Sequence, residues 1–155
     1  MIWCLISFIL LTAADQISKY IVNQSIALHA QIKVIDGFFY LTNTRNTGAA
    51  WSMLPGGRIF FIGMAAIVII AVFVYIYRLK DRKNLLTVSL VLVASGAFGN
   101  MIDRILYGYV VDFLDFYIFG YDFPVFNFAD CCLTIGVALI ILDTLFGKEQ
   151  ENGTA

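Results

Sequence analysis

The sequence predicts a membrane α-helical protein: a bundle of four transmembrane helices with a small extracytoplasmic β-hairpin or sheet and an interfacial aromatic segment. Hydrophobic residues make up 61% of the 155 residues and charged residues only 14%, whereas an ordinary soluble domain is about half apolar and a quarter charged. Four stretches also approach the roughly 20 apolar residues that a helix needs to cross a bilayer. At this length we expect residues 1–155 to form a single integral membrane domain.

The first predicted helix covers residues 2–22. It is apolar as far as Ala14 and is then interrupted by Asp15, Gln16 and Lys19. A cleaved signal peptide is the competing interpretation, but the expected basic residues are missing before the apolar run. Asp15 and Lys19 are four residues apart, so they can pair on one face of a helix. We therefore expect a retained transmembrane helix.

The other three helices are predicted at residues 59–77, 85–104 and 129–146. The second stretch is the most uniformly apolar, and the third becomes polar only at its end. The fourth opens with Asp130 and carries Asp143 near its other end, where an interfacial position would be inexpensive for a charge.

Basic residues predict the orientation of the bundle. Arg78, Lys80, Arg82 and Lys83 lie between the second and third helices, and cytoplasmic loops of membrane proteins carry an excess of Lys and Arg. That loop and both termini are then cytoplasmic, and the two longer connections face outward. The expected topology is multi-pass, and the acidic stretch from Asp103 to Asp130 then lies on the outer side.

The two outer segments carry their own signals. Residues 32–35 and 38–42 are apolar runs separated by Asp36-Gly37, a dipeptide typical of tight hairpin turns because both turn positions need positive φ. We expect a small sheet on the membrane surface. The second outer segment, residues 105–128, is dense in Tyr and Phe and is predicted to lie in the membrane–water interface.

Two aspartates, one in the second outer segment and one at the start of the fourth helix, are the leading catalytic candidates. Asp112 and Asp130 each follow an apolar run, and Gly120 and Pro124 can turn the chain between them. Two carboxyl groups in a site of low dielectric constant do not both ionise easily, so one proton is shared. The ionised member can activate water while the protonated member donates to a scissile carbonyl.

Glycines and polar residues recur at spacings of three and four at the end of the third helix and the start of the fourth, so each set shares one helix face. The glycines permit close approach of a neighbouring helix. The alternative is that the polar residues only hold the bundle together by hydrogen bonds; the whole set at one side of the membrane favours function. The two sets are Gly96, Gly99, Asn100, Asp103 and Arg104, and Asn127, Asp130 and Thr134.

Other chemistries find little support. The basic residues are scattered, which speaks against nucleic acid as a partner. Cys4, Cys131 and Cys132 give no disulfide framework. Cys131 and Cys132 beside Asp130 could belong to a metal site. The sequence gives this site little support, because His29 is the only histidine and lies in a different loop. His29 also lacks an evident serine partner.

Five blocks, in order along nearly the whole chain, make the sequence resemble the lipoprotein signal peptidases, the signal peptidase II family of bacterial inner-membrane aspartic proteases. The blocks are residues 15–19 (DQISK), 46–51 (NTGAAW), 96–104 (GAFGNMIDR), 108–113 (GYVVDF) and 123–130 (FPVFNFAD). One block alone would be weak, but five at this spacing are specific.

The resemblance implies an endopeptidase that removes the signal peptide of prolipoproteins just before a lipobox cysteine that carries a diacylglyceryl group. It implies no metal or organic cofactor, membrane lipid and diacylated prolipoproteins as partners, and we expect a monomer. By matching of the blocks, Asp112 and Asp130 are the catalytic pair. The substrate-binding residues would be Asn46, Asn100, Arg104 and Asn127, and the supporting residues Asp15, Lys19 and Asp103.

Two further points qualify the resemblance. Cys131 and Cys132 stand where small polar or small apolar residues are expected, which predicts sensitivity to thiol reagents. The rival interpretation is a proton-coupled transporter that uses the same carboxylates as a proton relay. Its expected signature is an inverted repeat with broken helices near the middle of the membrane. In this chain the acids lie at helix ends on one side, and the internal repeat is weak.

Overall fold

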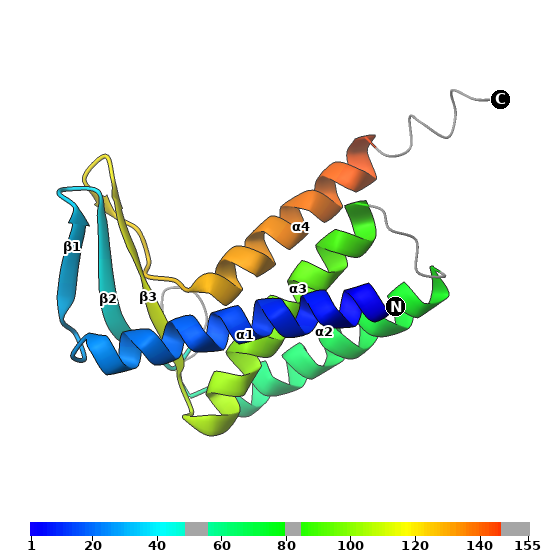
Figure 1. Cartoon of the computed structure of the whole chain (residues 1–155), viewed down its shortest axis with the longest axis horizontal. Coiled ribbons are helices and arrows are strands. Elements are labelled where there is room, and N and C mark those ends of the chain that lie inside the picture. Colours follow the sequence, from blue (N-terminus) through cyan, green and yellow to red (C-terminus); the bar gives the residue numbers. More distant parts are fainter. Residues whose placement is uncertain (49–55, 80–84, 147–155) are drawn as a thin grey trace.

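The computed structural model describes residues 1–48, 56–79 and 85–146, and it alternates long helices with short strands (Figure 1). The basic residues Lys80, Arg82 and Lys83 and the second half of the block at 46–51 lie outside the described residues. The elements are α1 (Ile2–Ser25), β1 (Gln31–Ile35), β2 (Phe39–Asn46), α2 (Arg58–Arg78), α3 (Leu85–Leu106), β3 (Val110–Ile118), β4 (Tyr121–Asp122) and α4 (Phe128–Phe146).

Four helices in the described part of the chain are long and apolar enough to cross a membrane, as the sequence predicts. The other three helices all pack against α3, so α3 forms the centre of the bundle. Its inward faces are small or polar, whereas α1, α2 and α4 expose Ile, Leu and Val on their outer faces. An apolar exterior around a more polar centre is the arrangement expected in lipid. Polar residues on α3 are therefore shielded from lipid and available for a site.

The helix ends differ from the predicted ones by a few residues. α1 runs to Ser25, three residues beyond the predicted end, and α3 runs to Leu106. α2 and α4 each begin one residue earlier than predicted, at Arg58 and Phe128. The residues added to α1 are polar, so the hydropathy criterion leaves them out, whereas those added to α3 are Ile105 and Leu106, which follow the polar residues Asp103 and Arg104.

The sheet lies at one end of the bundle and has the order β1-β2-β3-β4, with antiparallel neighbours (Figure 1). The predicted hairpin is present as β1 and β2. The expectation that both turn residues have positive φ is wrong, because Gly37 has φ +69° but Asp36 does not have positive φ. The prediction for residues 105–128 was incomplete, because this segment supplies β3, an interior strand of the sheet. The pairing of β2 with β3 brings Asn46 opposite Val110 and Thr44 opposite Asp112.

The two faces of β3 have different neighbours, because successive side chains of a strand point to opposite faces. Val111 and Phe113 pack with Val22 and Ile26 near the end of α1. The other face carries Asp112 and Phe116, and the ring of Phe116 stacks on Phe39 and Phe126. β3 is thus fixed on one side by α1 and presents a carboxyl group on the other.

Glycines let α3 and α4 approach closely. A Cβ atom at Gly136 would lie 2.8 Å from the carbonyl oxygen of Ser89, and one at Gly96 would overlap the carbonyl oxygen of Ala129. Side chains at these positions would force the two helices apart. The close contact at Gly96 holds the first turn of α4, which contains Asp130, against the polar end of α3.

Candidate active site

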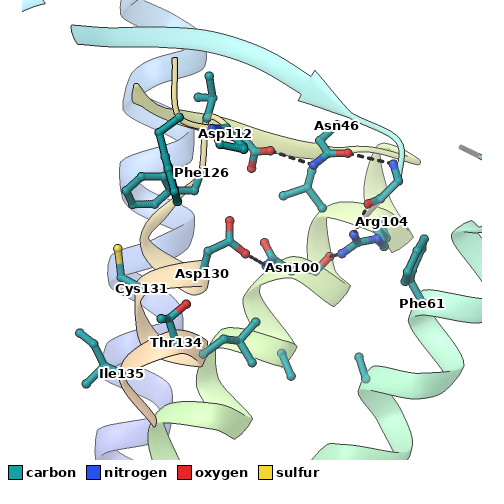
Figure 2. A pocket seen from close by; sticks show the side chains of 18 residues that line it. Asn46, Phe61, Asn100, Arg104, Asp112, Phe126, Asp130, Cys131, Thr134 and Ile135 are labelled. Atoms are coloured by element: carbon teal, nitrogen blue, oxygen red, sulfur yellow. Dashed lines mark hydrogen bonds between the residues drawn. The ribbon is translucent and has the colours of Figure 1, made fainter. Parts of the chain in front are cut away.

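A cavity of about 710 Å³ lies where the helices meet the sheet (Figure 2). Its polar wall carries Asn46, Asn100, Arg104, Asp112 and Asp130. Its apolar wall is built by residues of α2, α3, α4 and the segment between β4 and α4: Phe61, Ala65, Ala97, Leu133, Ile135, Phe123, Pro124, Val125 and Phe126.

Asp112 reaches the cavity from β3 and is only 3% exposed. Its Oδ1 accepts a hydrogen bond from Asn127 Nδ2 at 2.6 Å, and its Oδ2 accepts one from Asn46 Nδ2 at 3.1 Å. Both donors are neutral amides, so they satisfy the carboxyl oxygens without supplying a full charge.

Asp130 reaches the same cavity from the first turn of α4, where Asn127 caps the helix. The backbone N–H of Asn127 donates to Asp130 Oδ2 at 3.1 Å, and the N–H of Asp130 donates to Asn127 Oδ1 at 3.0 Å. This reciprocal pair is a capping box. Because the N-terminal end of a helix carries partial positive charge, it favours a carboxylate at this place.

Amide side chains join the two carboxyl groups. Asn100 Nδ2 donates to Asp130 Oδ1 at 2.8 Å, and Asn127 Nδ2 donates to Asn100 Oδ1 at 3.2 Å as well as to Asp112. Figure 2 shows the side chains of Asp112 and Asp130 directed toward one another across the cavity. Residues from β3, α3 and α4 thus form one polar cluster.

The pKa of Asp112 is raised to about 7. Burial is the largest cause, and the nearby charge of Asp130 adds to it, while hydrogen bonds from Asn46 and Asn127 and the charge of Lys19 oppose it. Asp112 therefore holds a proton through much of the range below neutral pH. A protonated carboxyl beside one that favours its charge can both give and take protons at a molecule bound between them.

Arg104 is held in place by three groups. Its guanidinium donates to the carbonyl oxygens of Asn100 at 3.2 Å and Gly48 at 2.8 Å, and it lies 4.8 Å from the ring centre of Phe61. It thereby connects the end of α3 with α2 and with Gly48, which lies two residues after the end of β2. Arg104 also places a positive charge near the two carboxyl groups.

A buried ionic cluster lies behind the polar wall. Lys19 Nζ contacts Asp15 Oδ2 at 2.9 Å, Asp103 Oδ2 at 3.0 Å and Asn100 Oδ1 at 3.0 Å. The pairing of Asp15 with Lys19 expected from their spacing is therefore present. Asp15 also accepts the backbone N–H of Ala129, and Asp103 accepts that of Val111. The cluster ties α1 and α3 to α4 and β3.

The structure brings together the residues that the sequence analysis selected, and it adds others. Gln16 was noted only as an interruption, yet its Nε2 donates to Asp15 Oδ2 and Asp103 Oδ1. Phe61 and Ala65 line the cavity from α2, a helix whose apolar sequence gives no sign of which face matters. Cys131 lines the cavity next to Asp130.

Three comparisons with known proteins bear on this site. A family model described as signal peptidase (SPase) II matches residues 7–146. The chain is 46% identical over 147 residues to a lipoprotein signal peptidase of Symbiobacterium thermophilum, covering 95% of each chain. It is 47% identical over 142 residues to a lipoprotein signal peptidase of Staphylococcus aureus strain JH9, covering 88% of this chain and 86% of that one.

Two solved structures described as bacterial membrane enzymes have the same fold. One superposes with a TM-score of 0.86 at 42% sequence identity and covers 98% of this chain and 92% of its own. The other superposes with a TM-score of 0.81 at 40% identity and covers 94% of each chain.

Proposed function

This chain belongs to the signal peptidase II family, and from that premise we propose that it is an aspartic endopeptidase that cleaves lipoprotein signal peptides with Asp112 and Asp130. The substrate would be a prolipoprotein whose lipobox cysteine carries a diacylglyceryl group, cut just before that cysteine. The observation that carries the proposal is the pair of carboxyl groups directed toward one another in one cavity, with a separate set of hydrogen-bond donors for each.

The proposed chemistry needs one proton between the two acids. Asp130, at the N-terminal end of α4, takes a proton from a water molecule as that water attacks the scissile carbonyl carbon. Asp112, which keeps its proton toward neutral pH because its pKa is raised to about 7, donates that proton to the carbonyl oxygen. The resulting tetrahedral intermediate collapses when Asp130 gives its proton to the nitrogen of the leaving amine and Asp112 takes a proton back from a hydroxyl group of the intermediate. The peptide C–N bond breaks, and both acids return to their starting protonation states. No covalent enzyme intermediate is needed.

The polar residues around the pair are proposed to bind the substrate backbone. Asn46 and Asn127 hold Asp112, and Asn100 holds Asp130. Arg104 is fixed by carbonyl oxygens and by the ring of Phe61, so its remaining N–H groups can donate to a substrate carbonyl. These donors surround a site large enough for an extended stretch of peptide.

The apolar wall supports a substrate that remains in the membrane. Below the carboxyl groups the cavity is lined by Phe61 and Ala65 of α2 and by Leu133 and Ile135 of α4. Because these helices expose apolar surface on their outer sides, the space between them suits an acyl chain or an apolar signal segment. A diacylglyceryl anchor would hold the scissile bond at the depth of the two acids.

The proposed location is the bacterial cytoplasmic membrane, with the carboxyl pair near the outer surface and both termini inside. The positive-inside tendency of residues 78–83 supports this orientation. The beginning of α1 and the end of α4 lie away from the sheet (Figure 1). We propose that the protein acts as a monomer, because the polar cluster described above draws all its members from one chain.

The transporter alternative has weaker support. Within the described residues the four spans are continuous α-helices, whereas transporter sites are typically formed by discontinuous helices near the middle of the membrane. The two carboxyl groups lie instead at the junction of helices and sheet. We therefore propose that the two carboxyl groups exchange protons during peptide hydrolysis and not during proton transport.

The test is cleavage by the purified protein in detergent. A peptide that contains a lipobox with a diacylated cysteine should be cut on the N-terminal side of that cysteine, and mass spectrometry of both fragments locates the cut. The same peptide without the diacylglyceryl group is the matched control and should be cut far more slowly. Equal cleavage of both peptides, or no cleavage of the lipidated one, would contradict the proposed function.

A further inference from the structure

We infer that Lys19, a buried residue of α1, is a positioning residue for the carboxyl pair: it fixes the amide of Asn100 so that the N–H group of Asn100 donates to Asp130. This inference rests on the proposed function, because it assigns the negative charge of the resting pair to Asp130 and the shared proton to Asp112. It extends that function to a residue on a helix that does not line the cavity.

The three contacts of Lys19 determine how Asn100 can lie. An ammonium group has three donors and no acceptor, and Lys19 Nζ reaches Asp15, Asp103 and Asn100 Oδ1 at 2.9–3.0 Å. The side chain of Lys19 is 3% exposed. Only the oxygen of the Asn100 amide can face the ammonium group, so its nitrogen must face the other way.

The other side of Asn100 is occupied by Asp130. Asn100 Nδ2 donates to Asp130 Oδ1 at 2.8 Å. If the amide were reversed, its oxygen would face the carboxylate and its N–H group would face the ammonium, so both contacts would be repulsive. Asn127 reinforces the same orientation, because its Nδ2 donates to Asn100 Oδ1 at 3.2 Å. The positive charge of Lys19 is thus transmitted through one amide to Asp130.

This arrangement makes the two acids unequal. Asp130 accepts hydrogen bonds from an amide that Lys19 orients and from the first turn of α4, whose partial positive charge favours a carboxylate. Asp112 lies on a strand and is 3% exposed, and among the described residues its side chain accepts hydrogen bonds from the neutral amides of Asn46 and Asn127. Burial raises the pKa of Asp112 to about 7, which agrees with a proton on that residue.

The charged and titratable groups that face the pair come from three helices. They are Lys19 and Asp15 of α1, Asp103 and Arg104 of α3, and Cys131 of α4. Of these, Lys19 is the group joined to Asp130 by a single intervening amide. Arg104 lies on the cavity side and is held by carbonyl oxygens.

The test is the acidic limb of the pH profile, which reports ionisation of the charged member of the pair. Asn100→Ala removes the donor to Asp130 and leaves the contacts of Lys19 with Asp15 and Asp103 in place. Lys19→Met removes the orienting charge. Both changes should move the acidic limb of kcat/KM upward by about one pH unit, the effect expected from loss of one hydrogen bond to a charged group. The double variant should shift no further, since the two residues act in series.

A matched control separates orientation from general support. Gln16→Met changes the same ionic cluster, because Gln16 contacts Asp15 and Asp103, but Gln16 has no bond to Asn100. It should leave the limb in place even if the melting temperature falls. An equal shift in Gln16→Met, additive shifts in the double variant, or an unmoved limb in Asn100→Ala would each overturn the inference. An unmoved acidic limb in Asn100→Ala overturns the inference even if Lys19→Met does not fold.

A second measurement does not depend on cleavage. Infrared titration of the protein without substrate follows the carboxyl groups directly, and the Asp130 signal is assigned by its loss in Asp130→Asn. Asp130 should titrate about one pH unit higher in Asn100→Ala than in the parent. If the variant shows this shift but the parent cuts no lipidated peptide, the proposed function fails, while the orientation of Asn100 toward Asp130 by Lys19 stands. If it cuts the peptide and Asp130 titrates unchanged, the inference fails alone.

Discussion

At the scale of single residues, the site depends on which carboxyl group is free to ionise. Both oxygens of Asp112 and of Asp130 accept a hydrogen bond. The donors to Asp130 are a backbone N–H at a helix end and the amide of Asn100, whereas those to Asp112 are two neutral amides. The sequence could predict that two aspartates after apolar runs are unusual. It could not predict their inequality, because Asn46 is brought to Asp112 by the pairing of β2 with β3, and α2 and α3 separate these strands in the chain.

The raised pKa of Asp112 makes a prediction about stability. The folded-state pKa of about 7 lies above the ordinary value of 3.8, so between these values the folded protein binds more protons than the unfolded chain. The free energy of unfolding therefore falls as pH rises through this window, by an amount on the order of a few kcal/mol. Asp112→Asn removes this term. Its melting temperature in detergent should approach that of the parent near pH 4 and exceed it increasingly up to pH 7.

The control for this measurement is Asp36→Asn, a change at an exposed carboxyl whose partner Lys33 is also exposed. Surface ion pairs of this kind contribute little to stability, so the difference from the parent should stay small across the range. If the melting temperatures of Asp112→Asn and the parent differ by the same amount at pH 4 and pH 7, the pKa of Asp112 is not raised.

At the scale of elements, close packing of α3 on α4 sets the position of Asp130. The sequence indicated that glycines of the third helix permit close approach, and the structure shows Gly96 against the first turn of α4. The hairpin could also be predicted, because its turn residues Asp36 and Gly37 are local signals. β3 could not, since its partner β2 is distant in the chain and the run from Val110 to Ile118 lacks regular alternation.

Gly96→Ala tests the role of this packing. The new methyl group would overlap the carbonyl oxygen of Ala129 and approach the backbone nitrogen of Leu133 at 3.0 Å, so the first turn of α4 must move. We expect kcat to fall about tenfold or more, since a shift of about 1 Å in catalytic geometry can be that costly. Gly63→Ala is the matched control: it is also within a helix, and a Cβ there meets no atom within 4 Å. Equal activity of the two variants would contradict the packing argument.

At the scale of the whole molecule, the alternation of helices and sheet places all the polar chemistry at one end of the bundle (Figure 1). Composition and length were enough to predict four spans, because the bilayer imposes their length. The apolar half of the cavity could not be predicted. Phe61 and Ala65 face it from a helix that is apolar on all sides, and only packing selects the face.

The proposed orientation is tested with single cysteines in whole cells. Phe119 lies in the turn between β3 and β4 and is fully exposed, so Phe119→Cys should react with a membrane-impermeant maleimide added outside. Thr144→Cys, near the opposite end of α4, should react only after the cells are permeabilised. The parent controls for its own thiols, of which Cys4 and Cys132 are buried. The reverse pattern would place the carboxyl pair on the cytoplasmic side and contradict the proposed location.

The most direct test of the central claim, that Asp112 and Asp130 carry out hydrolysis, measures cleavage and folding in the same samples. Asp112→Asn and Asp130→Asn keep the side-chain shape but remove the acid or the base. Each should lower cleavage of a diacylated lipobox peptide by roughly 10²–10⁴-fold or more, with a melting temperature at pH 7 no lower than that of the parent. If either variant cuts the peptide at a rate near that of the parent, or if activity is lost only because the protein unfolds, the two aspartates are structural and the account is wrong.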